Sequence, residues 1–437
     1  VSFSAAPFGE GRFEVTITPT SIDAGTPSGN SVQRFGRSAL AESAGTLNQS
    51  LNELSPILDQ IQSTVTTFFT AQDRLATAQA NPDIPESEIA RLTAELEAAE
   101  SNYTSALERN PVYEAGLRIE DLTQAQRDVF VAYLGEQGVD FDNLALNGES
   151  ADSFANSREL IETSLAGIQS RLQSASRVAR PGSQRESGAA LALGYQHGDV
   201  KIDVGSTPLG FDETNIVGGI NWTPNITENT SLSLTAGRRA VKDSVLSYAG
   251  AYDAQTGDTW GGVVSTGGRL GINYDTSNGG LYANAGMYEY TGDNVADNTA
   301  YDLSLGGYLR PINNERRQLQ TGVNVTAMAY DKDLSHFTYG HGGYFSPQDY
   351  VSISFPLRYQ ENVSEDLSWA AQVSPGYQSY STDDIDYFPT DPASQELLDI
   401  FSTLGATPES RYSGESVSGA GVSVSGEVKY NMTPELS

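Results

Sequence analysis

The sequence contains no cysteine, so it can form no disulfide and carry out no thiol chemistry. It is also poor in positive charge: 25 Lys and Arg residues stand against 56 Asp and Glu, a formal net charge of -31. Nucleic-acid phosphates are bound through Lys and Arg, so this balance argues against a nucleic-acid partner. Apolar runs are short as well, and none reaches the roughly 18 residues of a membrane-spanning helix. Only 38% of the residues are hydrophobic, which is unlike an ordinary soluble core.

Glycine and tyrosine are abundant instead, with 43 Gly and 22 Tyr in 437 residues. Transmembrane β-barrels have this composition because only every second strand residue faces lipid. About thirteen segments alternate apolar and polar residues and are predicted strands, among them "RFEVTITP" (12–19), "LYANAGMYEY" (281–290), "QTGVNVTAMAY" (320–330) and "GVSVSGEVKY" (421–430). Short turns and long polar loops connect them alternately, as in outer-membrane barrels. A soluble propeller would show a blade period, which this sequence lacks. We therefore predict an all-β transmembrane barrel.

Residues 35–186 have the pattern of α-helices. Apolar side chains recur there in steps of four and three, a coiled-coil seam, at Leu47, Leu51, Leu54, Leu58, Ile61, Val65 and Phe68. A second helix is expected after Pro85 and a third after Thr123, which is suited to cap it. A last helix would carry Phe154, Ile161, Leu165, Ile168 and Leu172. Such helices would bury one another as a bundle. We expect an entry hairpin of the barrel at 1–34, a helical insertion at 35–186 and the main barrel at 187–437.

The region from 187 to 430 carries a series of distinctive blocks: "DVGSTPLGF" (203–211), "GRRAVKDSVLSYAG" (237–250), "GDNVADNTAY" (292–301), "YDKDLSHFTYGHGGYFSPQDYVS" (330–352) and "YFPTDP" (387–392). In kind and in order, these blocks resemble the C-terminal barrel of the cellulose synthase outer-membrane subunits, the operon protein C family. The resemblance implies a sixteen-stranded barrel in the outer membrane of a Gram-negative bacterium, which passes a nascent β-1,4-glucan from the periplasm to the cell surface. Since about thirteen strands are visible, we expect the terminal strands that close the barrel to lie outside this sequence.

The resemblance also implies the partners. These are nascent cellulose or a related glucan, the inner-membrane cellulose synthase with its periplasmic subunits, and the lipid and lipopolysaccharide of the outer membrane. It implies no catalytic residue, no cofactor and no metal site, because elongation by the synthase drives export. Three other functions stay open: a general solute porin, a hydrolase, and a membrane anchor whose helical insertion is a docking or adhesion module.

The stretch "FTYGHGGYFSPQDY" (337–350) holds most of the candidate site residues. A pyranose ring stacks its apolar face on aromatic side chains, and its hydroxyls need polar partners at the edge. We expect polysaccharide contact or gating by aromatic residues (Tyr339, Tyr344, Phe345, Tyr350, Trp260) and by polar residues (Asp331, Asp333, Gln348, Arg238, Arg239). The alternative is that the rings pack the loop into itself or into the barrel rim, and that the arginines form internal ion pairs.

A hydrolase would need a base beside a nucleophile. His336 and His341 share a segment with Asp333 and Ser346, so a triad can be drawn, but their spacing gives it no support. We therefore predict that a His341→Ala change is nearly silent.

Overall fold

The computed structural model describes residues 2–8, 11–109, 114, 121–136, 150–159, 162–163, 181–254, 256–407 and 409–430. The chain divides into two compact units. The sheet unit comprises Val1–Gly36, Pro181–Asp391 and Arg411–Ser437, and the helical unit comprises Arg37–Arg180 and Pro392–Ser410. The helical insertion is thus slightly shorter than the expected 35–186. A second stretch, which we had assigned to the barrel, groups with the helices.

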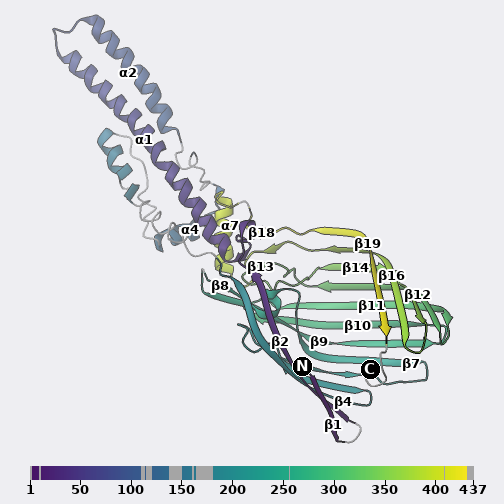
Figure 1. Ribbon diagram of the computed structural model, residues 1–437. Helices are drawn as coiled ribbons and strands as arrows, with labels where there is room; N and C mark the ends of the chain where they lie inside the picture. Colours follow the sequence, from purple (N-terminus) through teal and green to yellow (C-terminus); the bar gives the residue numbers. More distant parts are fainter. Residues whose placement is uncertain are drawn as a thin grey trace. The chain divides into compact units, whose positions relative to one another are not determined.

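The sheet unit is a curved, antiparallel sheet (Figure 1). Its strands are β1 (Ser2–Phe8), β2 (Gly11–Gly25), β4 (Gln184–His197), β5 (Val200–Ser206), β6 (Ile216–Trp222), β7 (Thr230–Ala240), β8 (Ala251–Asp253), β9 (Asp258–Thr276), β10 (Gly279–Asp293), β11 (Asn298–Asn313), β12 (Arg317–Tyr330), β14 (Asp349–Ser354), β15 (Leu357–Asn362), β16 (Leu367–Ser381) and β19 (Ser416–Tyr430). Two-stranded pairs join β3 (Phe35–Gly36) to β13 (Phe337–Thr338) and β17 (Ile385–Asp386) to β18 (Arg411–Tyr412). Short helices are η1 (Gly29–Ser31) and α6 (Val245–Ala249).

Neighbouring strands follow one another from β1 to β19. β14 and β15 are two halves of one strand, because both pair with β12 and with β16. With these halves counted as one strand and the three-residue β8 set aside, the 15 strands of the sheet reduce to the thirteen that the alternation predicted. Within the described part of the chain, β1 and β19 are the edge strands.

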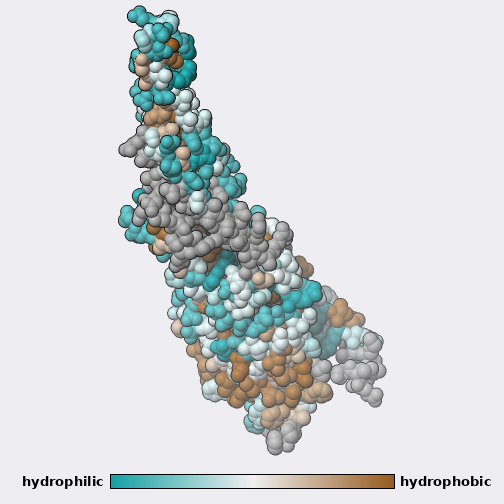
Figure 2. Space-filling view, turned by 90° about the vertical axis from the view of Figure 1, so that its left-hand side faces the viewer, coloured by the Kyte–Doolittle hydropathy of each residue, from teal (hydrophilic) through white to brown (hydrophobic). Residues whose placement is uncertain are grey.

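The sheet has an apolar face and a polar face, because side chains alternate along each strand. On the apolar face, Leu281 of β10 pairs with Tyr274 of β9, and Met287 is 56% exposed. Figure 2 shows hydrophobic side chains gathered in a band over the lower part of the sheet unit. On the other face, the Tyr282 hydroxyl donates a hydrogen bond to Asn324 of β12 (2.9 Å). An apolar band facing outward is the mark of a transmembrane barrel sheet. The predicted fold class, with its helical insertion, is confirmed.

The helical unit contains α1 (Ser38–Ala80), α2 (Glu86–Leu107), α4 (Gln124–Glu136), α7 (Pro392–Thr403) and helical residues at 151–159. The predicted seam is confirmed by its burial: exposure is 4% or less at Leu47, Leu54, Leu58, Ile61 and Val65. Phe154 is fully buried against Ile61, Val65 and Ala106. No helix among the described residues is long and apolar enough to cross a bilayer.

Helix starts follow the expected signals. Pro85 immediately precedes α2, and Thr123 accepts a hydrogen bond from the Gln126 backbone N–H at 3.3 Å where α4 begins. Of the apolar positions predicted for the last helix, four lie outside the described residues: Ile161, Leu165, Ile168 and Leu172.

The helix α7 corrects the expectation that 187–437 is all barrel. Pro392 occupies its first position, where a missing N–H costs nothing. Leu398, Ile400 and Phe401 are each 2% exposed or less. These apolar residues require a buried surface, and so 392–410 is part of the helical unit rather than a polar loop.

Candidate functional site

The aromatic loop, residues 331–348, connects β12 to β14 and is folded into the interior of the sheet unit. Leu334, Thr338 and His341 are fully buried, and Tyr344 is 2% exposed. Leu334 and Tyr344 belong to an apolar cluster with Phe35, Leu246, Ala251, Trp260, Val263, Val295 and Ala296. The loop is therefore a packed structural element.

Glycines allow this packing. Gly340 and Gly343 have φ angles of +100° and +63°, a region that other residues rarely adopt. A Cβ on Gly340 would lie 2.7 Å from Thr390 Oγ1. The N–H groups of Gly342 and Gly343 both donate to the Leu334 carbonyl, at 3.1 and 2.9 Å. The glycines thus serve the loop's own fold.

Two of the predicted sugar-stacking rings have no accessible face. Tyr344 stacks on Tyr290 with ring centroids 5.1 Å apart, and its hydroxyl accepts a hydrogen bond from Asn298 (3.2 Å). Trp260 is fully buried, with Tyr339 beside it at 6.0 Å between ring centroids. Contact with a polymer requires an exposed ring face, and neither Tyr344 nor Trp260 presents one in this structure. Tyr339 is half-buried against the same cluster.

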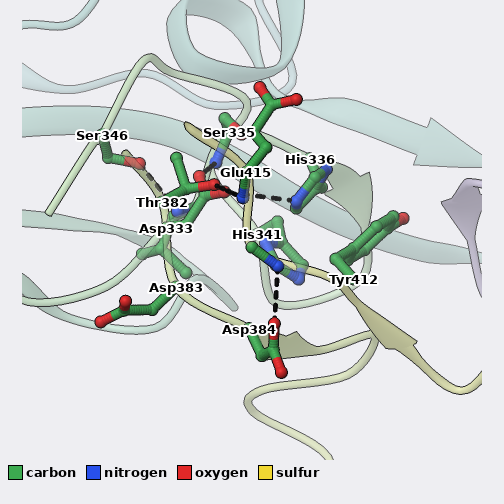
Figure 3. Close-up of polar contacts among 12 residues, drawn as sticks. Asp333, Ser335, His336, His341, Ser346, Thr382, Asp383, Asp384, Tyr412 and Glu415 are labelled. Carbon is green, nitrogen blue, oxygen red and sulfur yellow. Dashed lines mark hydrogen bonds and ion pairs between the residues drawn. The ribbon is translucent and has the colours of Figure 1, made fainter. Parts of the chain in front are cut away.

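The two histidines of the loop, His336 and His341, lie together (Figure 3). The His336 ring stacks on Tyr412, with centroids 3.5 Å apart and an interplanar angle of 8°. His341 packs edge-on against both rings, and its Nε2 donates to the Asp386 carbonyl (3.0 Å). Its Nδ1 has no hydrogen-bond partner among the described atoms. Complete burial, with His336 close by, lowers the pKa of His341 to about 3. His341 is therefore neutral at physiological pH.

The catalytic triad that could be drawn from Asp333, a loop histidine and Ser346 does not form. The Ser346 hydroxyl donates to the Tyr344 carbonyl (3.2 Å) and accepts from the Leu334 N–H (2.7 Å). His341 instead faces a backbone carbonyl, so Ser346 has no general base beside it. In the described part of the chain, no group of three or more His, Cys, Asp or Glu could hold a metal ion.

Two of the predicted polar residues, Asp333 and Gln348, are engaged in hydrogen bonds inside the protein. Asp333 is 5% exposed; it accepts from the Ser335 N–H (3.0 Å) and lies 3.5 Å from His336 Nε2. Burial opposes ionisation of Asp333, but hydrogen bonds from His336 and Ser335 outweigh it and lower the pKa of this carboxyl. The Gln348 amide donates to the Ser346 carbonyl and accepts from the Asp383 N–H. The Asp333 carboxylate is thus buried and hydrogen-bonded inside the protein, whereas Asp331 is exposed.

Arg238 and Arg239 point to opposite faces of β7, because they are consecutive residues of one strand. Arg239 donates to Asp203 of β5 (2.8 Å) on the polar face. Arg238 donates to Asn215 (3.2 Å) and Thr266 (3.4 Å). The two arginines therefore do not form one basic cluster, and Arg239 makes the internal ion pair of the alternative interpretation.

Aromatic rings gather where the loop rejoins the sheet; Phe345 is exposed, and Tyr350 and Tyr380 are half-buried. Phe345 is 41% exposed and meets Tyr380 edge-on at 5.2 Å and Tyr350 at 6.1 Å. Tyr350 and Tyr380 are register partners on β14 and β16. We call Phe345, Tyr350 and Tyr380 the rim cluster. The sequence analysis did not identify Tyr380. The signal available was strand alternation, which places Tyr380 on the same face of β16 as Gln378.

Comparison with known proteins bears directly on this sheet. The family profile described as "Cellulose synthase operon protein C C-terminus" matches residues 120–437. Cellulose synthase operon protein C of Xanthomonas axonopodis pv. citri (strain 306) is 35% identical over 451 residues, covering 98% of this chain and 29% of that protein. The namesake from Pseudomonas fluorescens (strain SBW25) is 37% identical over 257 residues, 58% of this chain and 19% of that protein.

The alignments cover only part of each relative. The chain spans less than a third of the length of either relative. The Xanthomonas alignment covers nearly all of the chain and so includes the helical unit. Among solved structures, a bacterial polysaccharide outer-membrane secretin matches 45% of this chain and 62% of its own at 9% identity, with a TM-score of 0.34. That overlap is too small to carry an argument.

Proposed function

Because the chain belongs to the family of the cellulose synthase operon protein C C-terminus, we propose that it forms the channel wall of an outer-membrane exporter. The exported polymer is a linear exopolysaccharide, cellulose or a closely related glucan. The family match over 120–437 carries this proposal. The two-faced sheet supports it, since the apolar face suits lipid and the polar face suits a hydrated chain of sugars.

Orientation follows from the connections between strands. The long connections 207–215, 241–257, 331–348 and 382–415 lie at one end of the sheet. The short turns 198–199, 277–278, 314–316 and 363–366 lie at the other end. Outer-membrane barrels have long loops outside and short turns in the periplasm. The helical unit is inserted at the long-loop end, because β2 ends and β4 begins there as the pair Gly25 and Gln184.

The aromatic loop is the gate of this channel in our proposal. Its buried residues hold it at the long-loop end, and its exposed Phe345 lies beside the half-buried Tyr350 of β14 and Tyr380 of β16. The chain has no catalytic role in export, and the inner-membrane synthase with its periplasmic subunits delivers the glucan. The remaining contacts of the channel are with outer-membrane lipid and lipopolysaccharide.

Two measurements on the full-length protein test this function. Cells that lack it should show cellulose at the surface again when the wild-type gene is restored, as measured by dye binding to intact cells. Liposomes containing the wild-type protein should exclude trisaccharides, whereas a variant lacking residues 339–345 should admit them. Free passage of trisaccharides through the wild-type protein would instead identify a general porin. If the restored protein reaches the cell surface but the amount of surface cellulose does not change, the helical unit as a docking module would be favoured.

A further inference from the structure

A cavity of about 520 Å³ lies over β14, β16 and β19. Two rows of residues paired across these strands contribute to its lining: Ser352, Gln378 and Gly419 in one, and Ser354, Gly376 and Gly421 in the next. Tyr350 stands at one end, two residues before Ser352 on the same face. The volume falls in the range of roughly 300–1,000 Å³ that is typical of small-molecule sites.

The lining of this cavity carries no charge among the described residues, although the chain has a net charge of -31. A second cavity differs in this respect, since Glu315, Arg316 and Lys429 contribute both signs to its lining. The polar side chains that line the first cavity carry serine and tyrosine hydroxyls and the Gln378 amide. A phosphate or carboxylate would find no cation there, so the ligand that fits is polar, neutral and rich in hydroxyls.

Tyr350 of the rim cluster supplies an aromatic wall of the cavity. Phe345 stands perpendicular to Tyr350 and Tyr380, at interplanar angles of 86° and 87°. Its backbone N–H is anchored on the Asp243 carboxylate (3.1 Å). The Tyr350 hydroxyl donates to Gln378 Oε1 (3.4 Å), which leaves the amide NH₂ group available as a donor. Aromatic faces beside hydroxyls and an amide are what a pyranose needs, because its C–H face is apolar and its edge is polar.

Glycines keep the cavity open. A Cβ built on Gly419 or Gly421 meets no atom within 4 Å. Space above the strand is therefore available to a ligand at these positions. We propose that this cavity is a binding subsite for a neutral β-linked glucan, with Tyr350 stacked on a sugar ring and Gln378 and the serines at its hydroxyls. The inference rests on the proposed export function and names the residues that hold the polymer.

Saturation-transfer NMR tests the subsite with the full-length protein in detergent and cellohexaose as the probe. Gly421→Leu fills the cavity, and Tyr350→Ala removes its stacking face; each should weaken binding about fivefold. Gly426→Leu is the matched control, because Gly426 lies on the opposite face of β19 and its Cβ would approach only the Ala370 carbonyl, at 3.8 Å. Tyr301→Ala removes a 49% exposed tyrosine from the apolar face and should have no effect.

Unchanged cellohexaose binding in both Gly421→Leu and Tyr350→Ala would overturn the subsite. Equal binding of a hexameric oligouronate would overturn the charge argument, because the cavity offers no cation to a carboxylate. Heat-modifiable migration on gels establishes that each variant is folded. Export is scored separately, by surface cellulose on cells carrying the same variants. If the wild-type protein exports cellulose but does not bind cellohexaose in the cavity, only the subsite is refuted. If the wild-type protein fails to restore export, the proposed function is refuted.

Discussion

Acidification should loosen the aromatic loop through His341. This side chain is fully buried with a pKa near 3, whereas an exposed histidine has a pKa of about 6.5. Between these values, the open loop binds a proton that the closed loop does not. The free energy that keeps the loop closed is therefore intact above about pH 6.5 and is lost as the pH falls toward 3.

The size of the effect follows from the two pKa values. The equilibrium constant for opening the loop is about 30-fold larger at pH 5 than at pH 7.5, a free-energy difference of about 2 kcal/mol. Neighbouring charges do not cancel this. The charge of His336 lowers the pKa of His341 and so acts in the same direction as burial, and hydrogen bonds lower the pKa of Asp333. Farther out, Arg411 is paired with Asp386 (3.0 Å).

Hydrogen exchange measures this opening in peptides that cover residues 334–347. After correction for intrinsic exchange rates, protection should fall about 30-fold between pH 7.5 and pH 5. Peptides from β10 and β11 serve as internal controls and should not change. In His341→Leu the pH dependence should vanish even if protection is lower throughout, while the exposed His197→Gln variant should behave as wild type. A pH-independent loop in the wild-type protein would refute the reasoning.

Other predictions concern the two units and their junction. Phe154→Ala should cost the helical unit about 3–5 kcal/mol, seen as a lower melting temperature of the helical circular dichroism, while the sheet signal stays in place. Gly36→Val should detach β3, because φ is +53° and a Cβ would lie 2.4 Å from Asp253; proteolysis near residue 30 should then increase. A cysteine pair at the registered positions Phe35 and Phe337 should reduce cellulose export when oxidised and restore it when reduced, with no native cysteine to interfere.

The strands and the helical seam could be read from the sequence because their signals are local. Alternation in "LYANAGMYEY" sets the two faces of β10 regardless of its neighbours. The apolar steps around Leu58 and Ile61 similarly fix the buried side of α1. The opposite directions of Arg238 and Arg239 were also readable, since consecutive strand residues alternate.

The burial of the aromatic loop could not be read in the same way. Tyr344 is covered by Tyr290, Tyr330 and residues far away in the chain, so no window of sequence around 337–350 reveals it. His341 illustrates the consequence. From the sequence, truncation of this residue looked silent, because no catalytic role was assigned. Its complete burial now predicts that His341→Ala leaves a cavity and loosens the loop. The rim cluster likewise depends on the pairing of β14 with β16.

The contacts of the aromatic loop also determine what must break when it moves. β13 in the loop pairs in parallel with β3, and the Tyr339 N–H donates to the Gly36 carbonyl (3.1 Å). On its other side, the Tyr412 hydroxyl donates to Thr338 (3.4 Å), and His341 donates to the Asp386 carbonyl. Gly36 is the last residue before the helical unit, and β17 and β18 flank its second stretch. Each such hydrogen bond contributes about 1 kcal/mol net, and more when one partner stays buried. Opening the loop therefore breaks its hydrogen bonds to the segments of the sheet unit that lead into the helical unit.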